Sequence, residues 1–594
     1  MLPPDARVIL LDQLRPPAGY MMDAAVATTF TLDLSAALIP PLAFASFELS
    51  GTPDPVAALE AVRSCTDRLD IFCQAGQITV PNQASDLMAF LEPMVHEVRR
   101  PRPGHLFHPK LWLLRYRAAN EPNRYRLLCL TRNLTHDHAW DVALRLDGII
   151  SGGPKAANRP LGDLIRALPG FAITPLADER RDRIVGLARE ARRIDWERPE
   201  DVNQIVFHAF GIRGLPHGAD FSGYRHLAIT PFLSDEGLAV VAPTSQELSV
   251  VSRTEELDRL TPDTVSGISS YVVSSIAGLG EDSTGADLAG EQILTGLHAK
   301  LYIAERNRQA HVFVGSANAT RAAFVGNVEF LVELIGGASR LGVATFLGPD
   351  APFRSLLEEY RTEGGADPDP VDEARRKLED LLRDIAAVPH TVTVSSAPAA
   401  GYLLTVTTAQ ILPIQDGFKV TMELLTRPGD AHNLVAEPTH ARYGPVPLAD
   451  ITPFLVVRAT SPEGLLGGTV IRGLLRNDPA GRLDEILARQ VDTPEKFLRF
   501  LMLLLGLGNP HLLAMLAGDG GASLGYANFG AAPGVFELIL RALADQPEAL
   551  TDLDRLVQRL QASESGRQVL PDGFEALWNV VADARRQLGE ADPA

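Results

Sequence analysis

The sequence predicts an α/β protein in which one module occurs twice, followed by a β-rich region and a helical region. Three observations lead to this prediction. Residues 22–80 alternate short apolar runs with helix-like stretches, a pattern typical of α/β folds. Residues 205–345 repeat the order of parts seen in residues 22–150, which indicates a diverged duplication. Each copy ends in a pair of strong strands, and each strand pair carries the motif H-x-K.

Length and composition indicate a soluble protein with several domains. A chain of 594 residues is too long for one hydrophobic core, so about two to four domains are expected. The N-terminus lacks a signal-peptide pattern, and the most apolar run, residues 500–506, is too short to span a membrane. Cys65, Cys73 and Cys129 are too few for a disulfide framework or a zinc cluster. We therefore expect a cytoplasmic protein without a membrane, metal or cofactor requirement.

Composition shifts divide the chain into five predicted regions. An acidic, Pro-rich stretch after residue 362 ends the second module, and strand-like runs separated by Gly and Pro follow residue 390. The predicted regions are a first module (1–160), connecting helices with a second module (161–365), a linker helix (366–390), a β-rich domain (391–475) and a helical C-terminal region (476–594). The C-terminal third carries no chemical motif, so target recognition, docking of a partner protein or a second copy, and structural support all stay open.

The two H-x-K motifs lie on predicted strands at residues 105–117 and 297–306. Residues two apart on a strand project from the same face, so His and Lys should lie side by side in each copy. Lysine is rare here, at six residues among 594, and about 0.14 chance occurrences of H-x-K would be expected where two are present. A lone strand histidine is more often structural, but the repeat of the pair favours a functional site.

The geometry of the two predicted hairpins adds an asparagine to each pair. A turn centred near residue 120.5 places Asn133 opposite His108, and a turn near residue 307 places residues 316–318 opposite His298. Directly opposed residues of an antiparallel pair lie about 5 Å apart at Cβ. Imidazole can attack or donate a proton, while ammonium and amide groups bind phosphate oxygens. Each hairpin thus offers His, Lys and Asn for phosphoryl chemistry.

Charge is unevenly distributed along the chain. The formal net charge of −19 argues against a general nucleic-acid coating protein. Residues 99–126, however, contain eight cations against Glu121 alone, which suits a cleft for one polyanion. The alternative is a solvated cationic face. The candidates for substrate binding in this stretch are Arg99, Arg100, Arg102 and Arg115.

The motifs resemble the signature of the phospholipase D superfamily, H-x-K followed by G-S-x-N. The second copy matches it closely, with Gly315, Ser316 and Asn318 in place, whereas the first has Leu130 and Thr131 where Gly and Ser are usual. An aspartate that often follows the lysine is absent from both copies. Its absence, and the segment TRNLTHDHAW, are similar to the tyrosyl-DNA phosphodiesterase branch. The resemblance covers roughly residues 20 to 350.

The resemblance implies two α/β/α modules packed as a pseudo-dimer around one metal-independent site. By this resemblance one histidine forms a phosphohistidine and the other protonates the leaving oxygen; we assign His108 as nucleophile and His298 as acid. Asp141 and Glu329, eight and eleven residues after their asparagines, are candidates to orient a histidine; the alternative for either is a surface salt bridge. The remaining candidates, which would hold the phosphoryl oxygens or assist, are Lys110, Lys300, Asn133, Asn318 and Ser316.

Several functions fit this prediction. The leading one is a nuclease-like phosphodiesterase acting on DNA, in a bacterial restriction or defence setting, because the basic stretch around His108 favours DNA over lipid. The alternatives are removal of an adduct from a DNA end, as in tyrosyl-DNA phosphodiesterase, hydrolysis of phospholipids, and a non-catalytic DNA-binding or assembly subunit that retains the fold.

Overall fold

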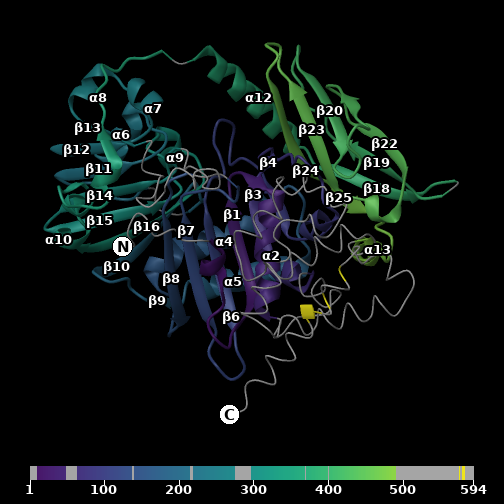
Figure 1. The fold of residues 1–594 in the computed structure, drawn as a ribbon, viewed down its shortest axis with the longest axis horizontal. Coiled ribbons are helices and arrows are strands. Elements are labelled where there is room, and N and C mark those ends of the chain that lie inside the picture. Colours follow the sequence, from purple (N-terminus) through teal and green to yellow (C-terminus); the bar gives the residue numbers. More distant parts are fainter. Residues whose placement is uncertain are drawn as a thin grey trace.

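The computed structural model of the chain is a mixed α/β fold with two large sheets and a β-rich region of two smaller sheets (Figure 1). The residues that the structure describes are 10–48, 63–136, 139–214, 218–274, 296–367, 369–398, 400–489, and the single positions 574, 578, 580 and 581. Among them, no helix has a stretch long and apolar enough to cross a bilayer.

The first module is built on a seven-stranded sheet. Its strands, in spatial order, are β5 (Val95–Val98), β3 (Leu69–Gln74), β1 (Met21–Thr29), β6 (Leu111–Arg117), β7 (Arg124–Leu130), β8 (Ala143–Ile150) and β9 (Ile194–Trp196). The strand β1 pairs in parallel with β3 and antiparallel with β6. Because β9 pairs with β8, the first sheet extends past the predicted boundary at residue 160.

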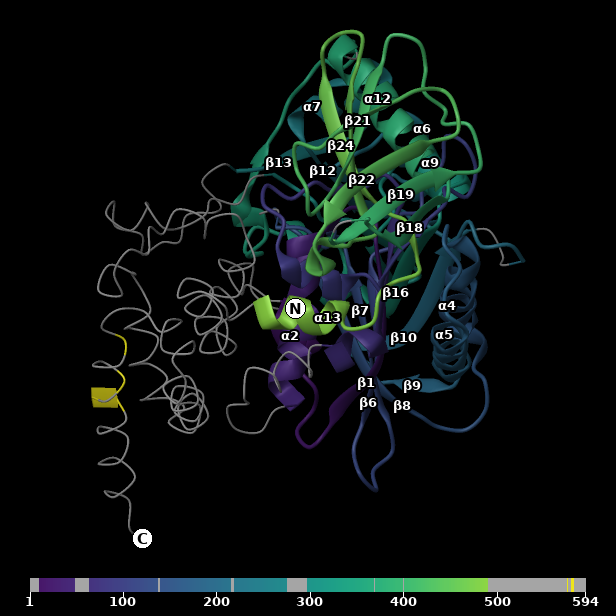
Figure 2. The ribbon, with the colours of Figure 1, turned by 90° about the vertical axis from the view of Figure 1, so that its right-hand side faces the viewer.

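Helices cover both faces of this sheet. The helix α2 (Leu34–Glu48) packs on one face with Ala25 and Leu114, whereas α4 (Arg159–Phe171) and α5 (Asp178–Ala191) pack on the other with Val26 and Leu113 (Figure 2). Neighbouring residues of one strand thus point to opposite cores, as the two-residue period of a strand requires. The remaining short elements are α1 (Leu10–Leu14), β2 (Leu32–Asp33), β4 (Ile78–Thr79) and the 3-10 turns η1 (Asp86–Leu91) and η2 (Ala156–Asn158).

The second module is built on an eight-stranded sheet. Its strands, in spatial order, are β10 (Val202–Phe210), β16 (Glu329–Gly337), β15 (Gln309–Gly315), β14 (Leu301–Arg306), β11 (Arg225–Ile229), β12 (Glu247–Val251), β13 (Ser269–Val273) and β17 (Leu357–Glu359). The series β12-β11-β14-β15-β16 has the same order and strand directions as β3-β1-β6-β7-β8. The duplicated order of parts is therefore present in the fold.

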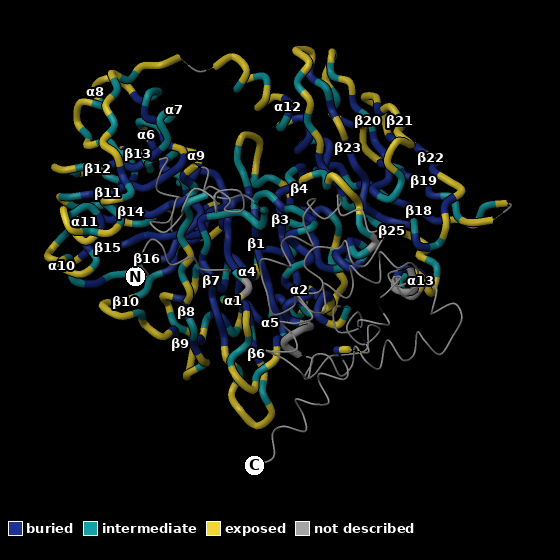
Figure 3. Tube along the Cα trace, viewed as in Figure 1, coloured by how far each residue is buried: buried dark blue, intermediate teal, exposed yellow. Residues whose placement is uncertain are grey.

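Short helices surround the second sheet. They are α6 (Asp235–Val241), α7 (Thr254–Asp258), α8 (Pro262–Ser266), α9 (Arg321–Val325), α10 (Ala338–Leu341), α11 (Val343–Leu347) and the 3-10 turn η4 (Arg354–Leu356). The middles of the strands in both sheets are buried, and exposed residues gather at turns and outer helices (Figure 3). The side chains of Phe207 and Phe330 from the second sheet join the core of the first module.

Each module exchanges backbone hydrogen bonds with the other at equivalent places. The amide of His108 donates to the carbonyl oxygen of Val328 at 2.9 Å, and the amide of His298 donates to that of Trp140 at 2.7 Å. In return, Val328 donates to Leu106 at 2.8 Å, and Trp140 donates to Gly296 at 3.0 Å. The residue before each H-x-K histidine therefore forms a parallel bridge with a residue that shortly precedes the other module's β8 or β16.

The register of the first hairpin differs from the prediction. In β6–β7, Leu111 pairs with Cys129, so an ideal extension places position 132, not Asn133, opposite His108. The predicted strand is also too long, because β6 begins at Leu111 and leaves His108 and Lys110 in an irregular segment. Pro109 between them has no amide to donate to a ladder, and this segment bonds to the other module instead.

The second hairpin has the predicted register. In β14–β15, Leu301 pairs with Val314, and the two-residue turn is formed by Asn307 and Arg308. Both turn residues have positive φ, 52° and 64°, as a type I′ turn requires. Continuing this register places position 317 opposite His298, inside the predicted range of residues 316–318.

The β-rich region consists of two four-stranded sheets and a preceding helix, α12 (Pro370–Ala386). The strands are β22 (His440–Val446), β19 (Tyr402–Thr408), β18 (His390–Ser396) and β25 (Leu474–Arg476) in one sheet, and β21 (His432–Leu434), β20 (Lys419–Leu424), β23 (Phe454–Thr460) and β24 (Leu466–Arg472) in the other. The 3-10 turn η5 (Leu448–Asp450) and the helix α13 (Arg482–Arg489) complete the described elements. Most of the predicted helical region 476–594 lies outside the described residues.

Candidate active site

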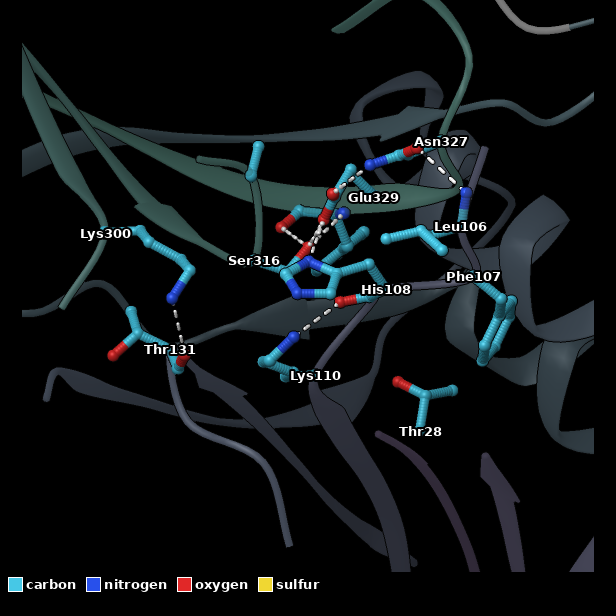
Figure 4. A network of polar contacts seen from close by, with 12 residues as sticks. Thr28, Leu106, Phe107, His108, Lys110, Thr131, Lys300, Ser316, Asn327 and Glu329 are labelled. Carbon is cyan, nitrogen blue, oxygen red and sulfur yellow. Dashed lines mark hydrogen bonds and ion pairs between the residues drawn. The ribbon is translucent and has the colours of Figure 1, made fainter. Parts of the chain in front are cut away.

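His108 lies at the contact between the two modules, where a carboxylate of the second module holds its ring (Figure 4). Its Nδ1 is 3.0 Å from Oε2 of Glu329, the first residue of β16. Burial lowers the pKa of His108 to about 4, although Glu329 acts in the opposite direction. A carboxylate can only accept, so Nδ1 carries the proton and Nε2 keeps a free lone pair.

Glu329 is completely buried and has three side-chain partners. Its Oε2 also accepts from the hydroxyl of Ser316, and its Oε1 accepts from the amide of Asn327 at 3.2 Å. Burial alone would raise the pKa of this carboxyl group, but His108 and the nearby donors outweigh burial and lower the pKa below its usual range. Glu329 therefore keeps its negative charge beside His108.

His298 takes its partner from the backbone of the first module. Its Nδ1 is 2.8 Å from the carbonyl oxygen of Thr131 and 3.3 Å from Nζ of Lys300. The carbonyl oxygen can only accept, so the shorter of the two contacts assigns the proton to Nδ1 and leaves Nε2 free. Burial lowers the pKa of His298 to about 2, and the positive charges of Lys300 and Lys110 act in the same direction. Both imidazoles are thus neutral, with the same nitrogen available for chemistry.

Two lysine ammonium groups are buried in the same place. Lys110 and Lys300 are each 1% exposed, and each donates to the carbonyl oxygen of the histidine two residues before it, at 3.0 Å and 2.9 Å. Lys300 also donates to the carbonyl oxygen of Thr131 at 3.3 Å (Figure 4). Burial lowers the pKa of Lys110 to about 7 and that of Lys300 well below its ordinary value. Lys300 also contacts Nδ1 of His298 at 3.3 Å, whereas the carbonyl oxygen of His108 is the one hydrogen-bond partner of Lys110 among the described residues. A buried ammonium that keeps free donors, as that of Lys110 does, favours binding of an anion.

Asp141 occupies the position in the first module that Glu329 occupies in the second. Asp141 follows Trp140, whose carbonyl oxygen accepts from the amide of His298. Glu329 follows Val328, whose carbonyl oxygen accepts from the amide of His108. The shorter Asp141 pairs with Arg132 at 3.6 Å, and burial raises its pKa. The two predicted acids are therefore equivalent in the fold, but they differ in their partners.

The irregular first motif keeps the hydroxyl of the regular one. Thr131 Oγ1 accepts from the amide of Val142 at 2.8 Å, just as Ser316 Oγ accepts from the amide of Phe330 at 3.0 Å. Gly315 is required in the second copy, because a Cβ there would lie 2.1 Å from the carbonyl oxygen of Phe330. The LTRN sequence therefore keeps a hydroxyl at the position that Ser316 has in the second copy.

Asn133 and Asn318 share an unusual feature. The side-chain Oδ1 of each is buried and has no hydrogen-bond partner among the described residues. The residue after each asparagine is held in the same way, because the amides of Leu134 and Ala319 donate to the hydroxyls of Thr29 and Thr230. An amide oxygen only accepts, so these two atoms need a donor that a phosphodiester does not have; the NH2 group of each asparagine is the part that can bind phosphate oxygens.

The predicted basic patch is largely neutralised within the fold. Arg115, which is five residues after Lys110, pairs with Asp23 at 2.5 Å and with Glu190 at 2.8 Å. Arg100 pairs with Asp380 at 2.8 Å and with Asp384 of α12. These two arginines stabilise the fold rather than forming a free cationic cleft.

The other two arginines remain on the surface. Arg99 and Arg102 are exposed, and Arg102 donates to the carbonyl oxygen of Val325 in the second module at 3.1 Å. They remain candidates for contact with a polyanion.

Two residues of the site were not predicted from the sequence. The ring of Phe30 lies edge-on against His108, with centroids 5.1 Å apart, and the Lys110 ammonium is 5.8 Å from the same ring. Asn327 bridges the modules, because its side chain donates to Glu329 and accepts from the amide of Leu106 at 2.9 Å.

The arrangement provides a nucleophile or base on each module and two buried lysines. No group of three or more His, Cys, Asp and Glu side chains at metal-binding distance occurs in the part of the chain that the structure describes. Hydrogen bonds join His108, Lys110, Ser316 and Glu329, and the carbonyl oxygen of Thr131 joins His298 to Lys300. Figure 4 shows Lys300 and Thr131 close to the group around His108.

Comparisons with known proteins give remote likenesses. No family model and no curated protein matches the chain. Among solved structures, the yeast tyrosyl-DNA phosphodiesterase is 13% identical over 57% of this chain and 87% of its own, with a TM-score of 0.35. The phosphatidylserine synthase of Haemophilus influenzae is 11% identical over 63% of this chain and 92% of its own, at 0.31. The polyphosphate kinase of Porphyromonas gingivalis is 13% identical over 64% of this chain and 46% of its own, with a TM-score of 0.29. Likenesses at these TM-scores carry no argument about function, so the chemistry is argued from the geometry of the site.

Proposed function

We propose that this protein is a metal-independent phosphodiesterase that cleaves DNA through a phosphohistidine on His108. The observation that carries the proposal is the bond between His108 Nδ1 and the buried carboxylate of Glu329 from the other module. It fixes the tautomer that leaves Nε2 free to attack phosphorus, and it stabilises the positive charge that forms on the ring. We further propose that the two modules form a pseudo-dimer, which their reciprocal backbone bonds support.

In the first step, His108 Nε2 forms a bond to phosphorus while the bond from phosphorus to the leaving oxygen breaks. His298 gives its Nε2 proton to that oxygen. The free site disfavours a protonated His298, because burial and Lys300 lower its pKa. A bound phosphodiester supplies a negative charge that offsets the lysines, so substrate binding promotes protonation of His298.

In the second step, His298 accepts a proton from water, and the hydroxide attacks phosphorus as the bond to His108 breaks. The product leaves as a phosphomonoester, and both histidines return to their starting states. Lys110 and Lys300 stabilise the charge on the non-bridging oxygens in both steps, because preorganised donors in a buried site lower the barrier most. Asn133 and Asn318 would donate from their amide groups after binding.

The assignment of His108 as the nucleophile rests on the asymmetry between the two modules. His108 is bonded to a carboxylate, which stabilises a cationic phosphohistidine, whereas His298 is bonded to a neutral carbonyl oxygen. DNA is preferred as the substrate because the exposed Arg99 and Arg102 lie on the segment that leads to His108. Positive side chains at such positions bind the phosphates that flank the scissile one.

The test is cleavage of labelled DNA in excess EDTA by the full chain and by His108→Ala, His298→Ala and His390→Ala. His390, in the β-rich region, is a matched control. It is buried, and its Nδ1 is 2.7 Å from the backbone carbonyl oxygen of Val388. We expect cleavage that His108→Ala abolishes and His390→Ala leaves intact. A thymidine p-nitrophenyl phosphodiester has a leaving group that needs no acid. His298→Ala should therefore release one burst of p-nitrophenolate and accumulate the thymidylyl group on His108.

Other outcomes would contradict the proposal in separate ways. Cleavage of a 3′-phosphotyrosyl oligonucleotide without cleavage of plain DNA would replace the nuclease with an end-processing enzyme. Phosphate trapped on His298 would reverse the roles of the two histidines. Unchanged cleavage by His108→Ala, or no cleavage of any phosphodiester by the folded wild-type chain, would reject the catalytic proposal.

A further inference from the structure

We propose that Phe232, supported by Arg253, is a stacking platform for an unpaired nucleobase beside the scissile phosphate on the His298 side. The proposal rests on the proposed DNA-cleaving function and deepens it, because it identifies how the site would select single-stranded or frayed DNA.

Phe232 is an exposed aromatic side chain beside the site. It is 41% exposed, and it is the one phenylalanine in the exposed class among residues whose burial the structure describes. It lies two residues after Thr230, whose hydroxyl donates to the Phe232 carbonyl oxygen at 2.9 Å and accepts from the amide of Ala319, next to Asn318. The loop that carries the ring is therefore anchored to the second motif.

Arg253 links this ring to the segment of His298. Its guanidinium carbon is 4.9 Å from the centroid of Phe232, which is a cation–π distance. The same guanidinium donates to the carbonyl oxygen of Leu297, the residue before His298, at 2.9 Å and 3.2 Å. One guanidinium thus separates the ring from the backbone that carries the proposed acid.

The first module has no such platform at the equivalent position. Thr29 donates to the carbonyl oxygen of Thr31 at 2.7 Å, as Thr230 does to that of Phe232, so Thr31 is the counterpart of Phe232. The aromatic ring of that loop, Phe30, is half-buried and lies against His108. Of these two equivalent loops, only the one on the His298 side therefore offers an exposed ring.

A nucleobase is the occupant that these features favour. Aromatic side chains bind the faces of bases in single strands, and an arginine behind the ring adds positive charge near the adjacent phosphates. The faces of a base inside a duplex are covered by its neighbours, so a protein ring reaches them only when the base is unpaired or at an end. Lys110 and Lys300 would hold the phosphate between this base and the attacking histidine.

The test uses the full chain and a single-stranded oligonucleotide that has one cleavable linkage between phosphorothioates. We expect Phe232→Ala and Phe232→Leu to lower kcat/KM by about 5- to 100-fold, the range of base–aromatic stacking, and Phe232→Trp to restore it. The loss of kcat/KM in Phe232→Ala should disappear when an abasic residue replaces the nucleotide on one side of the linkage. Without the base, the Phe232 ring of the wild type has nothing to stack on, so its removal has no further effect.

Tyr224→Ala is the matched control, since Tyr224 is a 45% exposed aromatic residue before the other end of β11. It should leave kcat/KM unchanged on every substrate. An equal effect of Phe232→Ala on normal and abasic substrates would overturn the stacking proposal while leaving the proposed function intact. Loss confined to a 3′-phosphotyrosyl substrate would also overturn it, because the ring would then stack on a phenol.

A second measurement does not depend on turnover. In the inactive His108→Ala chain, 2-aminopurine beside the linkage should lose fluorescence on binding, and the added change Phe232→Leu should prevent that loss. Quenching that depends on Phe232 supports the platform even if DNA is not cleaved, which would separate the failure of the proposed function from the failure of this inference. Quenching that persists in Phe232→Leu would reject the platform.

Discussion

At the scale of single residues, the site depends on which atoms each histidine contacts. The sequence predicted His108, Lys110, His298 and Lys300 because the H-x-K spacing is local. Glu329 was a candidate to orient a histidine, but the sequence did not indicate which one, since His108 and Glu329 are separated by 221 positions and meet only through the folding of both sheets. The shorter Asp141 at the equivalent place pairs with Arg132 instead.

The carboxylate of Glu329 should be required for the rate of the first step. Glu329→Gln removes the charge that stabilises cationic His108 and allows the wrong tautomer, so we expect kcat to fall by at least about 100-fold. Single-turnover cleavage measures this loss directly. Glu333→Gln is the matched control, because Glu333 lies on the same strand and also bonds histidines, at 2.8 Å to His208 and 2.6 Å to His311. Equal losses in both variants would show that the effect is structural.

Lys110 should make substrate binding dependent on pH. Its pKa is lowered to about 7 by burial, so its ammonium is present below that pH and is lost as the pH rises. We expect the affinity of the inactive His108→Ala chain for an oligonucleotide to fall by about 10-fold between pH 6 and pH 8.5, as the loss of one charged hydrogen bond predicts. Fluorescence anisotropy measures the affinity. Lys110→Arg keeps its charge and should remove this dependence; a persistent decline would assign it to another group.

At the scale of elements, the two hairpins show why one register was predicted and the other was not. The second turn is a two-residue type I′ turn, which fixes the pairing of β14 with β15 from the turn alone. The first is a longer loop, residues 118–123, in which Asn120 has positive φ. A longer loop allows more than one register, and the predicted pairing is off by one residue.

The second turn also offers a stability test. Arg308 is exposed and has a φ of 64°, a conformation that costs a side chain free energy and costs glycine little. Arg308→Gly should therefore raise the free energy of unfolding by about 1 kcal/mol, and Arg308→Ala should not. Urea unfolding of the two variants and the wild type measures the difference. A loss of stability in Arg308→Gly would mean that the arginine side chain contributes more than the strain costs.

At the scale of the whole molecule, the β-rich region is joined to the first module by buried polar contacts. Arg482 pairs with Glu92 at 2.6 Å, and the amide of Arg472 donates to Glu97 at 2.6 Å across 375 positions. Composition and turn residues predicted a β-rich domain after residue 390, because those signals are local. They could not predict this interface, since each contact depends on where two distant surfaces meet.

Glu97 should make the stability of this interface depend on pH. Burial raises the pKa of Glu97 from 4.5 to about 8, so the folded protein binds a proton between these pH values that the unfolded chain releases. Folding stability must therefore fall as the pH rises through this window. We expect the Tm of the wild type to decline from pH 5 to pH 8. Glu97→Gln keeps an acceptor for the amide of Arg472 and cannot ionise, so it should flatten that decline.

Glu423→Gln is the control, because Glu423 is a buried glutamate of β20 within the β-rich region; this variant should keep the wild-type slope. An unchanged slope in Glu97→Gln would mean that Glu97 is ionised in the folded state and that its charge is balanced by the Arg472 guanidinium.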